Sequence, residues 1–461
     1  MLVTATALVA TAAVGLVDPR VPAVLAAVVV TVLLLVGRSG AGRHRRAGEP
    51  LPGSTARGVR GLREMALHLS PVALLMVVFP LASSRIAETT VGGTGLTSVL
   101  LASSLTVPWI SQAVCLPLYR GIGHLVLEGD MQKIDRRFCE VWPTTFLQSL
   151  PAVVLFTVPV AVVTRWSAGA LAVYVGLCVL HVAFAQALVV TNVGRRRERW
   201  ALAWSAYAAA LLVAPTLWFL PALTGLAVQL VPLRHHLLSL RRPARLDHRD
   251  VASDLLRGLA LGAVLWSDKL LLFFVTGGQF AVQLVFVALL PAVLAYNYYF
   301  VRLAPRFDAS VAGLRVAMEQ DTYSALADRS RRMFDTVTVT VARSGAVGAV
   351  LALVLSVGAA LAGGQDVRLF AAVAVASWFF MMVTILSYKL DYIGHRLPAQ
   401  VIGGVHLVAC ITAFTTTASP AGAYIALTVV EAVLLVVAMR VCFERWRSPE
   451  YTLFWRHATA W

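Results

Sequence analysis

The sequence predicts an all-α polytopic membrane protein made of two six-helix lobes and an N-terminal helical hairpin, with about 14 membrane segments. Three observations lead to this prediction. The 461-residue chain is 59% hydrophobic and only 13% charged, whereas charged residues make up about 25% of an ordinary soluble domain. Apolar runs of membrane-spanning length recur along the whole chain. The basic residues gather in every second segment between these runs, as expected for a chain that crosses a bilayer repeatedly.

The first elements are a hydrophobic hairpin and a basic linker. Residues 1–37 contain two apolar runs that are separated only by Asp18, Pro19 and Arg20, which predicts a tight helical hairpin that is either membrane-spanning or partly embedded. No basic residue precedes the first run, so a cleaved signal peptide is not expected. Residues 38–63 are rich in Gly, Pro and Arg and are predicted to be a flexible cytoplasmic linker.

Twelve further apolar runs follow, and each is predicted to cross the membrane. The first lobe, 64–240, contains spans at about 66–85, 96–118, 141–164, 168–193, 200–217 and 219–233. A cytoplasmic linker, 241–257, precedes the second lobe, 258–443, with spans at about 258–277, 280–301, 336–361, 369–388, 398–417 and 422–439. Corresponding spans begin between 184 and 203 residues apart, and the longest polar insertion follows the second span in both sets. This layout predicts a duplicated six-helix unit.

The distribution of positive charge predicts the orientation. With both termini cytoplasmic, the inner segments, including 389–396 and the C-terminal tail 444–461, contain 33 of the 39 Lys and Arg residues, and the outer segments contain four. Cytoplasmic loops carry such an excess, so we expect a multi-pass protein of the cytoplasmic (inner) membrane. Attraction to anionic lipid headgroups accounts for the net charge of +16 without a nucleic-acid partner.

Catalytic and metal motifs were not found in the sequence. The predicted outer loops are short, and the inner segments contain no Walker A, HExxH or GxSxG pattern. The five cysteines form no CxxC pair and are interpreted as packing residues. The sequence therefore predicts a protein that is not an enzyme and needs no cofactor or metal.

Asp268 and Lys269 are the first candidates for a functional role. They lie near the middle of the predicted span 258–277, where each charge costs roughly 2.5–3.5 kcal/mol on insertion scales. Adjacent positions on a helix point about 100° apart, so the two residues are not obvious partners. Two interpretations stay open: one or both face a hydrated cavity, or they form structural pairs with other helices.

Four further residues are candidates for the substrate or ion pathway. Arg343 lies inside the predicted span 336–361, where it either snorkels to the inner face or pairs in the interior. Glu431, near the centre of the last span, either neutralises Arg343 or Lys269 or is a protonatable site. Tyr296 and Asn297 end another span on its inner side. Tyrosines there form an interfacial belt or stack on sugar rings.

Two polar insertions, 119–140 and 302–335, have helical spacing of apolar residues. We name them the first and second arm. Their apolar stripes are interpreted as faces in contact with lipid, with a partner-docking surface as the alternative.

The region 266–334 resembles a known family. The run DKLLLFF, a long apolar span and an arm ending in ALADRSRRMF are similar to PelG-type exopolysaccharide transporters of the multidrug/oligosaccharidyl-lipid/polysaccharide (MOP) flippase superfamily. The segment LYRGIGHLVLEGDMQKIDRRF resembles a weaker counterpart in the first lobe. The resemblance implies two lobes around a central cavity that opens alternately to each side, with Asp268 and Lys269 as substrate or ion contacts. It further implies export of a polysaccharide or lipid-linked glycan beside a cytoplasmic glycosyltransferase.

Two other functions remain open on the sequence. One is a major-facilitator-type secondary carrier of a small molecule, although the second arm is much longer than the corresponding loop of such carriers. The other is a non-transporting membrane scaffold that recruits a polysaccharide synthase through its arms and the tail 444–461.

Overall fold

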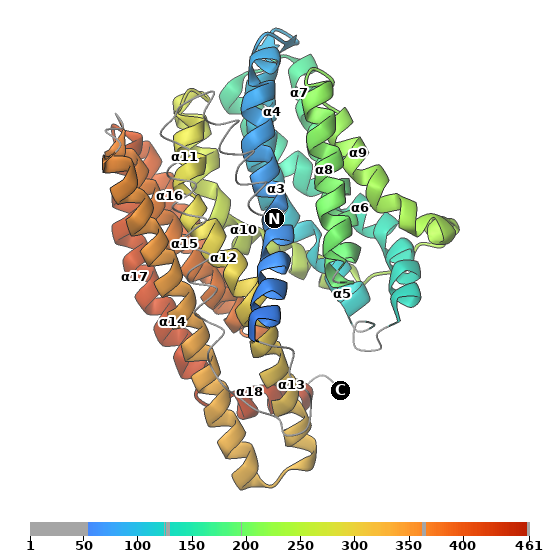
Figure 1. The fold of residues 1–461 in the computed structure, drawn as a ribbon, viewed down its shortest axis with the longest axis vertical. Coiled ribbons are helices and arrows are strands. Elements are labelled where there is room, and N and C mark those ends of the chain that lie inside the picture. Colours follow the sequence, from blue (N-terminus) through green and yellow to red (C-terminus); the bar gives the residue numbers. More distant parts are fainter. Residues whose placement is uncertain (1–53, 124, 126–129, 195, 362–365, 459–461) are drawn as a thin grey trace. The chain divides into compact units, whose positions relative to one another are not determined.

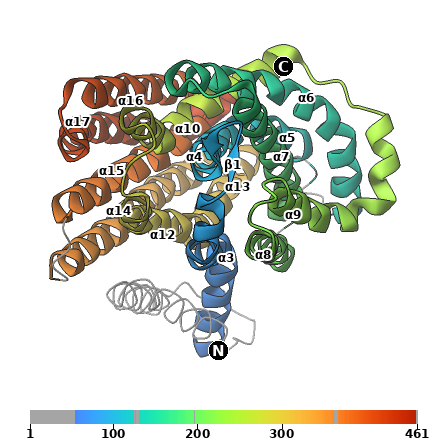
Figure 2. The ribbon, with the colours of Figure 1, turned by 90° about the horizontal axis from the view of Figure 1, so that it is seen from above.

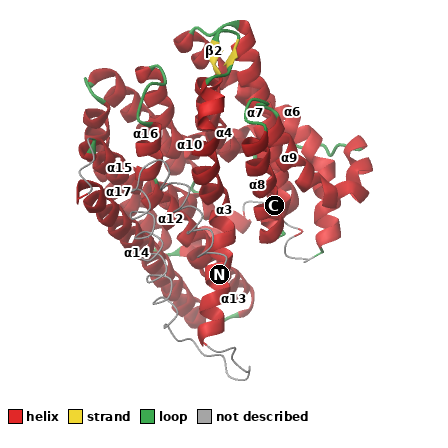
Figure 3. Cartoon of the chain, turned by 45° about the horizontal axis from the view of Figure 1, so that its top comes forward, coloured by secondary structure: helices red, strands yellow, loops and turns green. Residues whose placement is uncertain are grey.

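The computed structural model describes residues 54–458, apart from 124, 126–129, 195 and 362–365 (Figure 1). The predicted hairpin 1–37 and most of the linker 38–63 lie outside these described residues. Ten helices of the described chain are long and apolar enough to cross a membrane. The described elements are helical except for two short strands (Figure 3). An all-α polytopic architecture is thus confirmed for this part of the chain.

The described residues divide into two compact units, Leu67–Phe280 and the remainder. Helix α3 (Ser54–Ala87) contains the division between them. The unit Leu67–Phe280 continues with β1 (Thr90–Val91), β2 (Thr94–Gly95), α4 (Leu96–Val114), α5 (Leu116–Gly123), α6 (Met131–Thr164), α7 (Ala168–Val193), α8 (Arg197–Val213), α9 (Leu220–Leu230), a 3₁₀ segment η3 (Val231–Arg241) and α10 (His248–Thr276).

The strands β1 and β2 form a tight antiparallel hairpin between the first two spans. Thr90 pairs with Gly95 and Val91 with Thr94. The connecting Gly92 and Gly93 have φ angles of 55° and 79°. Glycine adopts such positive angles without a Cβ clash, which permits a two-residue turn that matches the twist of the strands.

Helix α10 packs tightly on α4 within the unit Leu67–Phe280. A Cβ atom at Gly258 would lie 2.2 Å from the Cα of Ala113, and one at Gly262 would lie 2.6 Å from the Trp109 ring. The Trp109 Nε1–H donates to the carbonyl of Leu259 at 2.9 Å. Two glycines four residues apart therefore let the helix backbones approach closely. The sequence layout instead assigned 258–277 to the second lobe.

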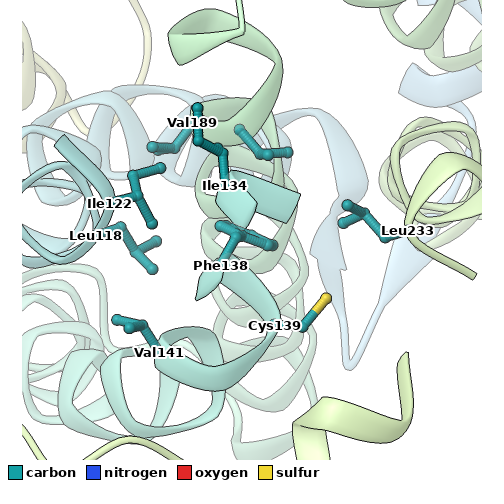
Figure 4. Packing of buried hydrophobic residues seen from close by; sticks show 9 residues of the cluster. Leu118, Ile122, Ile134, Phe138, Cys139, Val141, Val189 and Leu233 are labelled. Atoms are coloured by element: carbon teal, nitrogen blue, oxygen red, sulfur yellow. The ribbon is translucent and has the colours of Figure 1, made fainter. Parts of the chain in front are cut away.

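The described apolar residues of the first arm pack within the protein. Its Ile134 and Phe138 are buried in a cluster with Leu118 and Ile122 of α5, and Leu233 of η3 belongs to the same cluster (Figure 4). Asp130 caps the N-terminus of α6, because its Oδ1 accepts from two backbone N–H groups of the first turn. The interpretation of this apolar stripe as a lipid-facing surface was wrong, because protein side chains cover it.

The second unit contains α11 (Val282–Ala288), α12 (Leu290–Tyr298), a π-helical segment η4 (Tyr299–Leu303), α13 (Ala304–Gln320), α14 (Tyr323–Leu361), α15 (Val367–Tyr392), α16 (Arg396–Thr416), α17 (Pro420–Trp446) and α18 (Pro449–Ala458). Helices α14 to α17 lie side by side (Figure 2). The second arm forms α13 and the start of α14, and its Phe307, Val311 and Leu314 are buried. This stripe also packs within the protein, contrary to the lipid-facing interpretation.

Most predicted spans coincide with helices. Residues 168–193 were predicted as a span, and α7 has these same bounds. The predicted spans 200–217 and 219–233 correspond to α8 and α9, which are shorter than the ten long helices and are separated at residues 214–219. The break expected between these two spans is confirmed.

Candidate functional site

Asp268 and Lys269 form an ion pair with each other. The Lys269 Nζ lies 3.0 Å from the Asp268 Oδ1 and donates to the carbonyl of Leu265, one turn earlier, at 2.8 Å. The two residues did not look like obvious partners from the sequence, yet they are in contact. The long lysine side chain folds back over the preceding turn, and this bridges the angle between neighbouring positions on the helix.

Both members of this pair are buried. Their side chains are 0% and 4% exposed for Asp268 and Lys269, respectively. The hydrated environment considered for them is therefore not present in this conformation. A buried ion pair loses much of its Coulombic gain to desolvation and contributes little net stability. Its position in the apolar C-terminal half of α10 calls for a reason other than stability.

Glu431 is paired with a histidine that the sequence interpretation did not single out. The His406 Nδ1 on α16 lies 2.7 Å from the Glu431 Oε1 on α17, and both side chains are 0% exposed. The His406 Nε2 lies 3.2 Å from the Cys410 Sγ, one turn further along α16. Arg343 is exposed on α14. The predicted pairing of Glu431 with Arg343 or Lys269 is replaced by this buried contact with His406.

Tyr296 and Asn297 lie on α12 and have different surroundings. The Tyr296 hydroxyl lies 3.3 Å from the hydroxyl of Tyr388 on α15, and its ring meets that of Phe300 edge to face at 4.7 Å. The Asn297 Nδ2–H donates to the carbonyl of Val293 at 2.7 Å. Tyr296 and Asn297 are both half-buried. Tyr296 therefore belongs to a cluster of aromatic side chains, whereas Asn297 bonds to its own helix.

Lys389 is a second buried group that the sequence interpretation missed. It was counted with the charges of an inner segment, yet it belongs to α15 and is 1% exposed. Its Nζ lies 3.8 Å from the centre of the Phe307 ring and 5.3 Å from that of Tyr299. No hydrogen-bond acceptor for the Nζ occurs among the described residues. The aromatic residues that flank it, in SYKLDY, were the available signal.

The aromatic cluster around Lys389 joins four helical segments. Phe307 of α13 meets Trp446 of α17 at 5.2 Å and Tyr392 of α15 at 5.1 Å, both edge to face. Tyr299 comes from η4. The cluster therefore connects the start of the second arm to the ends of α15 and α17.

The candidate residues fall into two groups by compact unit. Asp268 and Lys269 lie in the unit Leu67–Phe280, whereas the Glu431–His406 pair and the Tyr296 cluster lie in the other unit. Within the described part of the chain, no group of three or more His, Cys, Asp or Glu residues is arranged to hold a metal ion. The sites thus offer charge, proton exchange and aromatic surface.

The C-terminal tail folds back on the second arm. Helix α18 contacts α13 and α14. Its Leu453 is buried, and the Ser330 Oγ–H of α14 donates to the Glu450 carboxylate. The part of 444–461 that the structure describes is therefore partly used in intramolecular packing.

The sequence matches no known family and no curated protein, but solved structures resemble the chain. An inward-facing multidrug resistance MATE family transporter of the MOP superfamily has a TM-score of 0.47 and 12% identity, over 91% of this chain and 99% of its own. An outward-facing MATE transporter has a TM-score of 0.39 and 12% identity, over 91% and 95%. A MOP superfamily transporter from Pyrococcus furiosus has a TM-score of 0.39 and 11% identity, over 91% and 95%. The chain is thus similar in structure to MOP superfamily transporters at low sequence identity.

Proposed function

We propose that this chain is a membrane transporter that moves a polysaccharide or lipid-linked glycan from the inner to the outer face of the cytoplasmic membrane by alternating access. The observation that carries the proposal is the buried Asp268–Lys269 pair in the apolar C-terminal half of α10. Charges at this depth in a spanning helix are expensive and typically mark a substrate or ion pathway.

The energetics of the pair favour a functional role over a structural one. Apolar residues of similar volume at these two positions would be as stable as the ion pair or more stable. Gly258, Gly262 and Trp109 make close contacts between α10 and α4, and these contacts do not involve the two charges. In our proposal, water and substrate separate the two charges in a second conformation, and each charge then contacts the substrate.

A glycan is the substrate class that best fits the remaining candidates. Sugar rings present apolar C–H faces together with hydroxyl groups, and aromatic side chains with polar tips complement both. Tyr296 and Tyr388 provide such groups, with their hydroxyls adjacent and their rings half-buried. The similarity of 266–334 to PelG-type transporters supports an exopolysaccharide. A cytoplasmic glycosyltransferase would then supply the polymer, and membrane lipids would surround the spans.

The packing of the tail is less favourable to a pure scaffold. A scaffold that recruits a synthase through its C-terminal tail needs an accessible tail, whereas α18 is held on α13 and α14 through Leu453 and Glu450. Tail deletion therefore discriminates between the two functions.

The decisive experiment removes both charges without removing volume. The double variant Asp268→Asn/Lys269→Met is expressed as the only copy in the producing cell, and secreted polysaccharide is measured together with membrane abundance and unfolding stability. We expect normal abundance, stability equal to or above that of the unchanged protein, and loss of export. Normal export would overturn the proposal, and loss of stability together with export would assign the pair a structural role.

A matched control is present on the same helix. Asp254 is also a buried carboxylate of α10, and it pairs with Arg120 and Arg257. Asp254→Asn should lower stability, because Arg120 and Arg257 both lose their contact with this carboxylate, and of its described ion pairs Arg120 keeps only the one with Asp250. Polysaccharide export per folded molecule should not change. The two buried carboxylates of α10 therefore have opposite expected outcomes.

A further inference from the structure

The buried contact between α16 and α17 contains three groups that exchange protons. Glu431 and His406 each lie near the middle of their helix, and they meet at 2.7 Å with neither side chain exposed. Cys410 continues the chain of contacts on the other ring nitrogen of His406 at 3.2 Å. Each nitrogen of the imidazole therefore has a partner, which fixes the orientation of the ring.

The charge balance of the pair requires one bound proton. If His406 is neutral and Glu431 is ionised, the pair has a net charge of −1 in a position without solvent exposure. One added proton, on either the imidazole or the carboxyl group, makes the pair neutral overall. Burial of a net charge without a counter-ion is strongly unfavourable, so the protonated pair is the stable form.

The second carboxyl oxygen supports this conclusion. The Glu431 Oε2 is buried and has no hydrogen-bond partner in the described part of the chain. A fully ionised carboxylate is stabilised by donors to both oxygens, and here only the Oε1 has one. The Glu431 carboxyl group therefore has a donor for only one of its two oxygens among the described residues.

The neighbours of the His406 ring that the structure describes, besides Glu431, include an aromatic ring and a thiol. From α15, the ring of Phe380 meets the His406 ring edge to face at 4.9 Å. From α16, the neighbouring titratable group is the Cys410 thiol. Helix α14 also packs against α17, and its Arg343 side chain is exposed.

We propose that α16 and α17 enclose a proton-binding site, in which His406 and Glu431 together hold one proton while the two helices remain in contact. The proton is taken up from water before the contact closes and returns to water when the contact opens. The contact between the two helices is thereby linked to pH. This inference does not depend on which substrate the protein moves.

The linkage has a defined sign. Above pH about 6.5 the unfolded chain has an unprotonated histidine and an ionised glutamate, so it does not hold this proton. The folded chain does hold it. Rising pH therefore favours unfolding, by about tenfold in the unfolding equilibrium constant per pH unit for one proton. The effect ends at the pH at which the folded pair itself loses the proton.

The test compares the full-length protein with Glu431→Gln in detergent micelles. The amide has the shape of the carboxyl group and accepts the same hydrogen bond from His406, but it has no proton to lose in this range. Unfolding equilibrium constants are measured in denaturant at pH 7, 8 and 9. All other titratable groups occur in both proteins, so their contributions cancel in the ratio. We expect the ratio of the unchanged protein to the variant to rise about tenfold per pH unit.

Two further proteins complete the test. Cys410→Ala keeps the proton of the pair, so it should show the same pH dependence as the unchanged protein between pH 7 and 8, where the thiol of an unfolded chain is still mostly protonated. If Glu431→Gln does not fold, the apolar double variant His406→Leu/Glu431→Leu replaces it as the reference without the proton. A ratio that is independent of pH between 7 and 9 would overturn the proposal.

Discussion

Replacement of Lys389 by methionine should stabilise the protein. Lys389 is 1% exposed, its ammonium group has no hydrogen-bond acceptor among the described residues, and its Nζ lies 3.8 Å from the centre of the Phe307 ring. A desolvated cation–π contact contributes about 2 kcal/mol, whereas the desolvation penalty of a buried ion is several kcal/mol. Desolvation therefore exceeds the attraction to the rings.

The expected increase in the free energy of unfolding depends on the packing contacts that methionine retains at this position. Its side chain fills a similar volume, and a sulfur–aromatic contact returns about 0.3–1.5 kcal/mol. We expect Lys389→Met to raise the free energy of unfolding by about 1–2 kcal/mol, within the gain of 1–4 kcal/mol seen when buried ionic groups become apolar. Lys389→Ala should instead lower it by about 2–4 kcal/mol, because truncation leaves a cavity among Phe307, Tyr299 and their neighbours.

The assay is denaturant unfolding of both purified variants beside the unchanged protein, with membrane insertion as a control for folding in the cell. If Lys389→Met destabilises the protein as much as Lys389→Ala does, the cation–π contact outweighs desolvation, and our reasoning on this cluster is refuted.

Two predictions concern packing. Gly258→Ala should lower the free energy of unfolding by about 1–3 kcal/mol, because its Cβ would lie 2.2 Å from a backbone atom of α4. Gly404→Ala in α16 has open space around its Cβ and should raise the free energy of unfolding by up to about 1 kcal/mol. Equal effects of the two variants in denaturant unfolding would refute the close contact of α10 with α4. Deletion of 449–461 should lower the free energy of unfolding by about 1.5–3 kcal/mol, because it removes the buried Leu453. Polysaccharide export per folded molecule should persist. Loss of export in a stable deletion variant would favour the scaffold function.

The sequence predicted the helices better than their contacts. Apolar runs determine where a chain can cross a membrane, so the span 168–193 was predicted with the bounds of α7. Spacing alone does not give the rotation of one helix against another, and the contact of Glu431 with His406, 25 residues earlier, depends on that rotation. For the same reason, the apolar stripes of both arms were interpreted as lipid-facing although protein covers them.

The candidate charges were located correctly, but their environment was not. Asp268 and Lys269 were identified because charges are rare within spans. Their mutual contact was missed because the lysine side chain bends toward Leu265. Lys389 was missed for a different reason: hydropathy does not distinguish a lysine that reaches the interface from one that aromatic rings enclose.

Access of water to α10 is the most direct test of our central claim, that the Asp268–Lys269 pair opens during a transport cycle. Leu272 lies one turn after Asp268 and is 1% exposed. Leu272→Cys is prepared in a background that keeps only Cys178 of the native cysteines, which is buried on α7 and serves as the control. Cells that export polymer and cells that do not are treated with a membrane-impermeant thiol reagent, and labelling of both cysteines is measured. We predict labelling of Cys at position 272 that depends on export, with Cys178 unlabelled. If position 272 remains unlabelled under both conditions, the pair stays sealed and the account is contradicted.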